Sequence, residues 1–98
     1  MRVHNDPRVD KEIRALPRKN SARIVQVSEL FKEHGFGLTE LHLKKITKNV
    51  WELRSGRWRL FFGMVGQTAV IVQILFKKTQ KTPSEVIRLA EKRLREYL

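Results

Sequence analysis

The segment from Trp51 to Phe76 constrains the fold more than any other part of the chain, because its hydrophobic residues recur with a period of two. In "WELRSGRWRLFFG", a two-residue turn at Ser55-Gly56 would join two antiparallel strands and place Arg54 opposite Arg57. The apolar side of this hairpin would consist of Trp51, Leu53, Trp58 and Leu60, and the charged side of Glu52, Arg54, Arg57 and Arg59. The alternation therefore predicts a hairpin with one buried face and one charged face.

A third strand is expected after the hairpin. "TAVIVQILF" (residues 68–76) is apolar on both faces, which is typical of a strand covered on two sides, and "GMVGQ" (residues 63–67) would form the turn before it. Upstream, "LTELHLKKITKN" (residues 38–49) alternates around Leu41 and Leu43, and this pattern leaves open a short strand or an irregular segment. The middle of the chain is therefore expected to form an antiparallel meander of three or four strands.

Two helices are expected before the meander. Asp6-Pro7 has the form of an N-cap followed by proline at the first helical position, and this helix would end at Pro17. A second helix would begin at Asn20 or Ser21 and end at Gly35, a common C-terminal capping residue. The buried sides of the two helices would carry Val9, Ile13, Leu16, Ile24, Val27, Leu30 and Phe31. The spacing predicts an amphipathic helical hairpin.

A third helix is expected at the C-terminus. Thr82 and Glu85 have the spacing of a capping box, with Pro83 at the first helical position. The residues available for burial on this helix are Val86, Ile87, Ala90, Leu94 and Tyr97. The expected fold is a single α+β domain over residues 1–98, in which an N-terminal helical hairpin packs on a small antiparallel meander with a C-terminal helix.

The positive charge of the chain is concentrated in its middle. The chain has 21 Lys and Arg against 10 Asp and Glu, which gives a net charge of +11 and a pI near 10.8. Between Lys44 and Lys81 there are nine basic residues and one acid, Glu52, whereas the flanks carry twelve basic and nine acidic residues. Excess lysine that serves only solubility would be spread more evenly. The distribution favours a polyanionic partner such as nucleic acid.

Several classes of site are excluded or disfavoured by the residues present. The chain has no cysteine, so it has no thiolate nucleophile and no cysteine-based zinc site. His4, His34 and His42 are far apart in the sequence with no carboxylate cluster beside them, and we expect no metal site and no cofactor. No apolar run approaches the length of about 20 residues that spans a bilayer. We therefore expect a cytoplasmic protein without a membrane partner.

A cationic site without a metal suits few reactions, and RNA cleavage is one of them. The 2′-hydroxyl of RNA is the nucleophile, so a protein need only orient it, accept its proton and neutralise the charge at phosphorus. Arginine suits the last task because its planar guanidinium contacts two phosphate oxygens and stays charged. A lysine crowded by like charges, such as Lys77 or Lys78, could transfer protons. Composition alone favours the simpler alternative, in which the cations only hold a nucleic-acid backbone.

The sequence resembles the RelE/HigB-type toxins of type II toxin–antitoxin systems, and in particular their phage-derived branch. The similarity covers Val50 to Leu94 and includes "WELR", the following aromatic-arginine strand, and the unusual string "FKKTQKTP" before a helix. The resemblance implies a RelE-like fold and a ribosome-dependent mRNA endonuclease, or mRNA interferase, that acts in the 30S A site by 2′-hydroxyl attack without metal. It also implies a helix-turn-helix antitoxin as partner, with operator DNA contacted only through that antitoxin.

The resemblance also implies roles for individual residues. Four cations match positions around the scissile phosphate and would be catalytic: Arg54, Arg59, Lys77 and Lys78. Four others would bind RNA, namely Lys44 and Lys45 as a basic approach to the site, Arg57 in the variable turn, and Lys81 in the branch-specific string.

Two departures from the family pattern concern proton transfer. RelE has a tyrosine after the last strand where this chain has Ile87, and a lysine on the first hairpin strand where this chain has Glu52; Tyr97 is further along and is expected to pack. The base would then be Lys78, Lys45, His42 or Glu52, unless orientation and charge suffice. For Glu52 we favour a salt bridge that holds Arg59. The missing tyrosine also makes an alternative credible, a non-cleaving basic homologue that binds RNA or the ribosome.

A third departure is at the N-terminus. Family members begin with a β-strand before the first helix, and "MRV" (residues 1–3) leaves little room for one. We therefore expect the sheet to lack this edge strand and to expose backbone groups that an antitoxin could cover by strand addition.

Overall fold

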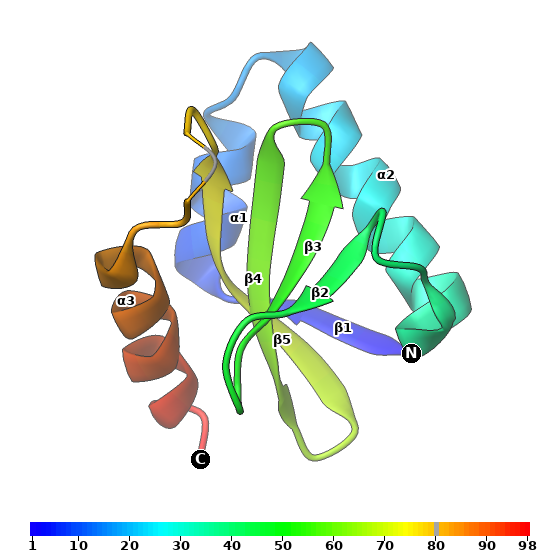
Figure 1. Ribbon diagram of the computed structural model, residues 1–98. Coiled ribbons are helices and arrows are strands. Elements are labelled where there is room, and N and C mark those ends of the chain that lie inside the picture. Colours follow the sequence, from blue (N-terminus) through cyan, green and yellow to red (C-terminus); the bar gives the residue numbers. More distant parts are fainter. Residues whose placement is uncertain (80) are drawn as a thin grey trace.

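The computed structural model describes residues 1–79 and 81–98 and contains a five-stranded sheet with helices on both faces (Figure 1). The strands are β1 (Arg2–Asn5), β2 (Leu43–Lys45), β3 (Trp51–Ser55), β4 (Trp58–Val65) and β5 (Thr68–Phe76). The helices are α1 (Pro7–Arg14), α2 (Arg18–His34) and α3 (Ser84–Arg95), with a 3₁₀ turn, η1, at Gly35–Gly37. The strand order β1-β5-β4-β3-β2 places β4 at the centre and β1 and β2 at the edges.

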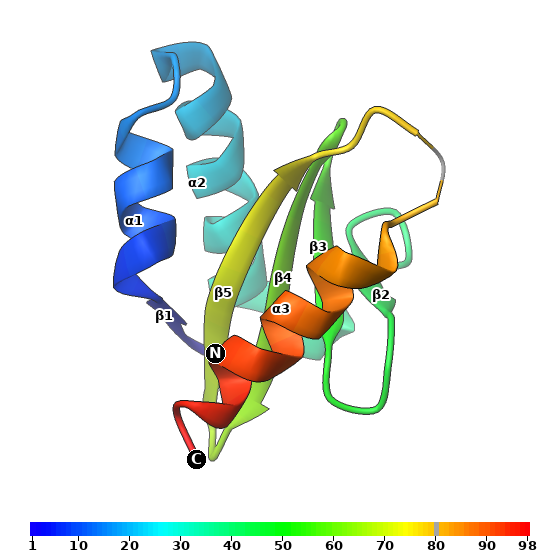
Figure 2. The same cartoon turned by 90° about the vertical axis from the view of Figure 1, so that its left-hand side faces the viewer.

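The elements form three layers. Figure 2 shows α1 and α2 on one side of the sheet and α3 on the other. One apolar cluster lies between the sheet and the first two helices and includes Val9 and Phe31, and a second lies beneath α3 and includes Phe61 and Leu94. β5 supplies buried residues to both clusters, which confirms the prediction of a strand covered on two sides. In the described part of the chain, no helix has the length and apolarity needed to cross a membrane.

The N-terminal edge strand is present, so the expectation that the sheet lacks it is wrong. β1 is four residues long and pairs in parallel with β5, with Asn5 opposite Ile71. A short segment suffices because Asp6 serves two elements: its N–H donates to the Ile71 carbonyl at 2.9 Å, and its carboxylate accepts from the Arg8 N–H at 2.8 Å. The sheet is therefore mixed and five-stranded rather than an antiparallel meander of three or four strands, and β1 occupies the edge proposed for strand addition.

The three predicted helices are confirmed, with changes at their ends. Asp6 caps α1 and Pro7 occupies a first-turn position, as expected. α2 begins at Arg18 rather than at Asn20 or Ser21. The capping box predicted for α3 is wrong, because Pro83 occupies the N-cap position and no side chain caps this helix.

The β3–β4 hairpin keeps its predicted sidedness in a different register. Its turn is at Gly56-Arg57 rather than at Ser55-Gly56, so Arg54 lies opposite Arg59 instead of Arg57. Gly56 has a φ of 58°, which glycine adopts without strain. Because the pairing moves by two positions, every strand side chain stays on its predicted face.

The next turn is also shorter than expected. β4 continues through Val65, and the turn lies at Gly66-Gln67 instead of over residues 63–67. Gly63 is therefore a strand residue, and it lies beneath α3. A Cβ atom at this position would be 2.6 Å from Cδ1 of Leu94 and 2.7 Å from the carbonyl oxygen of Asn49. The absence of a side chain lets α3 and the loop before β3 approach the sheet closely.

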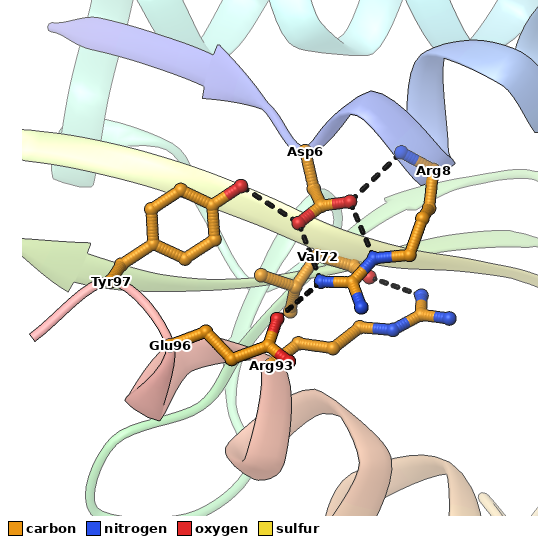
Figure 3. Close-up of polar contacts among 6 residues, drawn as sticks. All are labelled: Asp6, Arg8, Val72, Arg93, Glu96 and Tyr97. Atoms are coloured by element: carbon orange, nitrogen blue, oxygen red, sulfur yellow. Dashed lines mark hydrogen bonds and ion pairs between the residues drawn. The ribbon is translucent and has the colours of Figure 1, made fainter.

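Hydrogen bonds around Asp6 join the two ends of the chain (Figure 3). The buried carboxylate accepts from the Tyr97 hydroxyl at 2.7 Å and from the Arg8 guanidinium at 2.8 Å, and Arg8 also pairs with Glu96 at 2.6 Å. Tyr97 therefore packs, as expected, and in addition ties the end of α3 to the start of α1.

A β-bulge marks the middle of the β4–β5 pair. Phe61 lies opposite Gln73 and Phe62 opposite Ile71, which leaves Val72 without a partner on β4. Arg93 of α3 donates to the Val72 carbonyl at 2.8 Å (Figure 3). The bulge thus provides α3 with a polar anchor on the sheet.

Candidate functional site

The sheet face towards α3 has an apolar part and a cationic part. Phe61 and Val70 are buried in the apolar cluster beneath α3. Glu52 lies opposite Phe61 and shares its face, and strand alternation places Arg54 and Arg59 on that face as well. The cationic part is at the end of the sheet where the β3–β4 turn and the end of β5 lie together (Figures 1 and 2). Strand parity therefore puts these arginines on the same face as α3, beyond the apolar cluster.

A hollow of about 450 Å³ opens at this end of the sheet. Its lining comes from β3, the β3–β4 turn, β4 and the segment after β5, and consists of Arg54, Arg57, Arg59, Lys77, Lys78 and Thr79. Five of these six residues carry a positive charge, and none of the described lining residues is acidic. We call this the cationic hollow. It brings together all four cations that the resemblance assigns to catalysis, with Arg57 beside them.

Glu52 is next to this hollow and is completely buried. Its Oε1 accepts a hydrogen bond from Nε of Arg54 at 2.6 Å, and Nε of Arg59 lies 3.5 Å from the same oxygen. The expected salt bridge to Arg59 is present, but Arg54 is the closer partner. Oε2 of Glu52 and Nε of Arg59 have no hydrogen-bond partner among the described residues. Since Glu52 has no exposed surface, it is placed to orient the arginines rather than to contact a substrate.

Arg59 is held in place by the turn that precedes it. Its Nη1 donates to the carbonyl oxygens of Gly56 at 2.7 Å and Trp58 at 2.9 Å. The side chain is 14% exposed. Burial lowers the pKa of its guanidinium from its usual value, Glu52 opposes this change, and the charge of Arg54 lowers the pKa further. An arginine remains protonated in proteins despite such a shift. Arg59 is therefore a cation fixed before any ligand arrives.

Lys77 has a lowered pKa for reasons that lie in the same cluster. Burial of its ammonium group is the main cause, and the positive charges of Arg59, Arg54 and Lys44 lower the pKa further, while Glu52 raises it. A lysine whose pKa is lowered releases its proton more readily. Lys77 is thus suited to proton donation in addition to charge neutralisation.

The other predicted RNA-binding lysines are placed differently from one another. Lys44 lies opposite Glu52 on β2 and shares the cationic face. Lys45 points to the opposite face, where its Nζ lies 5.4 Å from the centre of the Trp51 ring. Lys81 is exposed and lies outside the lining of the hollow. None of the three lysines lines the hollow, but Lys44 shares its face of the sheet, whereas Lys45 does not.

His42 lies immediately before β2 and next to Arg54. The Arg54 N–H donates to the His42 carbonyl at 2.8 Å, and Nδ1 of His42 is 3.2 Å from the Arg54 carbonyl oxygen. The other two histidines lie elsewhere, His4 against Tyr97 and His34 at the end of α2. Across residues 1–79 and 81–98, no three His, Asp or Glu side chains are grouped as metal ligands.

Thr79 lines the hollow, although no sequence pattern singles it out. The only signal is its place in the string "FKKTQKTP", where a loop threonine is not distinctive by itself. A larger hollow of about 570 Å³ lies beside α3 and includes Met64 and Leu94 together with the oppositely charged Lys48 and Glu91. It is lined by two cations, Lys48 and Arg95, and by the acidic Glu91, whereas the cationic hollow has five cations and no acid among its described residues, so the cationic hollow is the better candidate for a phosphate site.

Two solved structures have a similar fold. The archaeal RelE–RelB complex from Pyrococcus horikoshii OT3 matches with a TM-score of 0.62 at 17% sequence identity, over 79% of this chain and 94% of that chain. The RelB–RelE antitoxin–toxin complex from Methanococcus jannaschii matches with a TM-score of 0.58 at 22% identity, over 82% of this chain and 99% of that chain. At these identities the similarity concerns the fold, which is RelE-like as expected.

Sequence comparison places the chain in a family. No curated protein matches its sequence. The family described as "Phage derived protein Gp49-like (DUF891)" matches residues 11–95. This range contains every residue of the cationic hollow, as well as His42 and Glu52. The chain therefore belongs to the Gp49-like family of phage-derived proteins, which agrees with the predicted phage-derived branch, and its fold is RelE-like.

Proposed function

We propose that this protein is the toxin of a type II toxin–antitoxin pair and cleaves translated mRNA in the 30S A site of the ribosome. The reaction is attack of an RNA 2′-hydroxyl on the adjacent phosphate without a metal ion, which leaves a 2′,3′-cyclic phosphate and a 5′-hydroxyl. One observation carries this proposal: five positively charged side chains converge on one hollow, and a buried carboxylate orients two of them.

The arrangement of the two strand arginines supports this chemistry. Arg54 and Arg59 lie directly opposite each other on neighbouring strands, so both can contact one phosphate. Glu52 holds Arg54, and the carbonyl groups near the turn hold Arg59, before any substrate is present. Donors that are already oriented stabilise the charge that develops on phosphorus without further reorganisation.

The lysines at the end of β5 have complementary roles. Lys77, with its lowered pKa, is suited to protonate the leaving 5′-oxygen. Lys78 is exposed at the hollow and would neutralise further phosphates of the RNA backbone. Lys44 extends the positive surface towards β2.

The proposal includes a protein partner. The similar structures from Pyrococcus horikoshii OT3 and Methanococcus jannaschii are complexes with RelB. For this chain the family resemblance implies a helix-turn-helix antitoxin, which would neutralise the toxin in the cytoplasm and provide the contact with operator DNA. A small helix-turn-helix protein encoded by the adjacent reading frame would support this pairing.

The decisive test is cleavage of translated mRNA by variants of the hollow. We expect Arg59→Ala to abolish growth arrest upon induction, because loss of one oriented donor lowers such rates on the order of a hundredfold. Lys78→Ala should weaken the arrest. Primer extension should show A-site cuts for the wild-type protein and none for Arg59→Ala. Lys19→Ala, which removes an exposed cation from α2, is the matched control and should remain fully toxic.

Thermal melting curves must accompany these assays, because Arg59 also donates hydrogen bonds to the carbonyl oxygens of Gly56 and Trp58 and its loss could destabilise the fold. Lys78 is exposed, so its variant tests the site even where Arg59→Ala does not fold. Full toxicity of both variants in folded form would reject this site. A wild-type protein that binds ribosomes without cutting mRNA would instead support the non-cleaving homologue.

A further inference from the structure

We propose that Nε2 of His42 is the general base that accepts the proton of the attacking 2′-hydroxyl. This inference rests on the proposed function and goes beyond it, because it selects one proton acceptor among the residues around the cationic hollow. It depends on the hydrogen bond of the imidazole, on the position of His42 relative to Arg54, and on the burial of Glu52.

The hydrogen bond of the imidazole determines its tautomer. Nδ1 of His42 lies 3.2 Å from the carbonyl oxygen of Arg54. A carbonyl oxygen can only accept a hydrogen bond, so Nδ1 must carry the proton that makes this contact. In a neutral imidazole with a protonated Nδ1, the lone pair is on Nε2. The tautomer is therefore the one in which the far nitrogen is free to accept a proton.

The backbone places His42 beside Arg54. The Arg54 N–H donates to the His42 carbonyl at 2.8 Å, so His42, which lies in the turn just before β2, is next to Arg54 of β3. Arg54 lines the cationic hollow, so the imidazole, whose Nδ1 is 3.2 Å from the Arg54 carbonyl oxygen, lies next to one of the residues that line it. His42 is half-buried, and its own N–H donates to the Thr39 carbonyl at 3.0 Å, which anchors the residue.

The other candidates for the base are placed less favourably. Glu52 is fully buried and is paired with Arg54, so its carboxylate has no surface that a 2′-hydroxyl could approach. Lys45 is on the opposite face of the sheet, beside Trp51. Lys78 is an exposed cation among other cations. His42 is the residue of this group whose hydrogen bonding leaves a lone pair available.

The proposed step transfers two protons and exchanges one bond at phosphorus for another. The 2′-oxygen forms a bond to phosphorus while its proton passes to Nε2 of His42, which becomes an imidazolium. The bond from phosphorus to the 5′-oxygen breaks, and that oxygen takes a proton from the ammonium group of Lys77. His42 then releases a proton to water, and Lys77 recovers one from water. The products are the 2′,3′-cyclic phosphate and the 5′-hydroxyl, and no oxidant or metal is required.

The tautomer can be measured without RNA. We expect a long-range proton–nitrogen correlation spectrum of the free, ¹⁵N-labelled protein to show the neutral imidazole of His42 with a protonated Nδ1 and an unprotonated Nε2. The opposite tautomer would overturn the proposal. In the spectrum of His34→Gln the signals of His34 disappear, which helps to assign the remaining histidines. The His42 signals should be unchanged.

The catalytic role is tested by cleavage in a reconstituted translation reaction with excess toxin. His42→Gln retains an amide that can donate to the Arg54 carbonyl but has no basic nitrogen, and we expect it to lose about a hundredfold or more in rate. His42→Ala should be slow as well and should regain activity when imidazole is added, which a merely structural role would not produce. His34→Gln is the matched control and should cut like the wild-type protein.

Two failures are distinguishable in this experiment. A wild-type protein that does not cut translated mRNA overturns the proposed function, and the role of His42 with it. A wild-type protein that cuts, together with a folded His42→Gln variant that cuts equally fast, overturns only the assignment of the base.

Discussion

Glu52 shows how one buried charge can organise a cationic site. It is the single acidic residue between Lys44 and Lys81, yet none of its surface is exposed. A buried carboxylate requires paired charges, and Arg54 and Arg59 supply them. In turn the carboxylate offsets the repulsion between the arginines and raises the pKa of Lys77 against their effect. Glu52 therefore controls both the orientation of the site and its charge.

This role predicts the effect of Glu52→Gln. The amide is nearly isosteric and keeps an oxygen that can accept from Arg54, but it removes the negative charge. We expect a loss of about 1–3 kcal/mol in the free energy of unfolding, since hydrogen bonds to charged groups contribute this much. We also expect slower cleavage by the folded variant, because Arg54 is held less firmly. Urea denaturation and the cleavage assay measure the two effects.

The matched control is Glu40→Gln, because Glu40 is exposed. This substitution should change the free energy of unfolding by no more than about 0.5 kcal/mol and should leave the cleavage rate unchanged within experimental error. In Glu52→Gln the pKa of Lys77 should also fall further, since the charge that opposed the lowering is gone. Unchanged stability together with an unchanged Lys77 titration would contradict the assigned role.

Among the elements, α3 covers the apolar part of one sheet face and leaves the cationic hollow at the end of that face uncovered. It packs through Ala90 and Leu94 on the apolar cluster, while the cationic hollow lies at the end of the sheet where β5 finishes. The segment that leads into α3 carries Lys77 and Lys78. The packing of the helix and the position of these lysines are therefore linked through a short connection.

Gly63 is the position where this packing is most sensitive. We expect Gly63→Ala to destabilise the protein by about 1–3 kcal/mol, because its Cβ would lie 2.6 Å from Cδ1 of Leu94 and 2.7 Å from a backbone oxygen. Gly37→Ala is the control, since a Cβ there would meet nothing within 4 Å. Thermal denaturation of the two variants measures the difference. Equal stability of Gly63→Ala and Gly37→Ala would contradict this prediction, because it would mean that α3 can move away from the sheet without destabilising the protein.

At the scale of the whole molecule, the network around Asp6 joins the two ends of the chain (Figure 3). The hydrogen bond from Arg8 holds the pKa of Asp6 well below its usual range, and the Tyr97 hydroxyl adds to this effect. A carboxylate with a depressed pKa stabilises the fold above about pH 4, and this contribution is lost as the pH falls. Burial, together with the hydrogen bond to Asp6, raises the pKa of Tyr97 to about 12.

The shift of Tyr97 predicts a loss of stability in alkali. In the unfolded chain tyrosine titrates near pH 10, so between about pH 10 and about 12 the unfolded state binds fewer protons and is increasingly favoured. We expect Tyr97→Phe to remove this component of the decline. Near neutral pH the variant should be less stable by about 1–2 kcal/mol, because a hydrogen bond to a buried carboxylate is lost. Urea denaturation over this pH range measures both effects. An identical alkaline decline in both proteins would refute the coupling.

Alternation of apolar and charged residues is enough to assign which side of each central strand faces the core. Leu53 and Leu60 belong to the core, and Arg54 and Arg59 line the cationic hollow, although the turn lies one residue later than expected. Parity is a local property of a strand, so it survives a change of register by two positions. The same local information located the helices and, through the motif "FKKTQKTP", the family.

Other features depend on contacts between residues that are distant in the sequence. β1 forms because it pairs in parallel with β5 and because the Asp6 N–H, at the end of β1, donates to the Ile71 carbonyl of β5. The sequence of these four residues does not reveal a pairing with a strand so far along the chain. The pairing of β2 with β3 places Lys44 opposite Glu52, and the fold brings Nδ1 of His42 to 3.2 Å from the carbonyl oxygen of Arg54. Burial of Glu52 is likewise set by its neighbours. Local periodicity assigns faces, whereas register, burial and protonation follow from contacts between segments that are far apart in the chain.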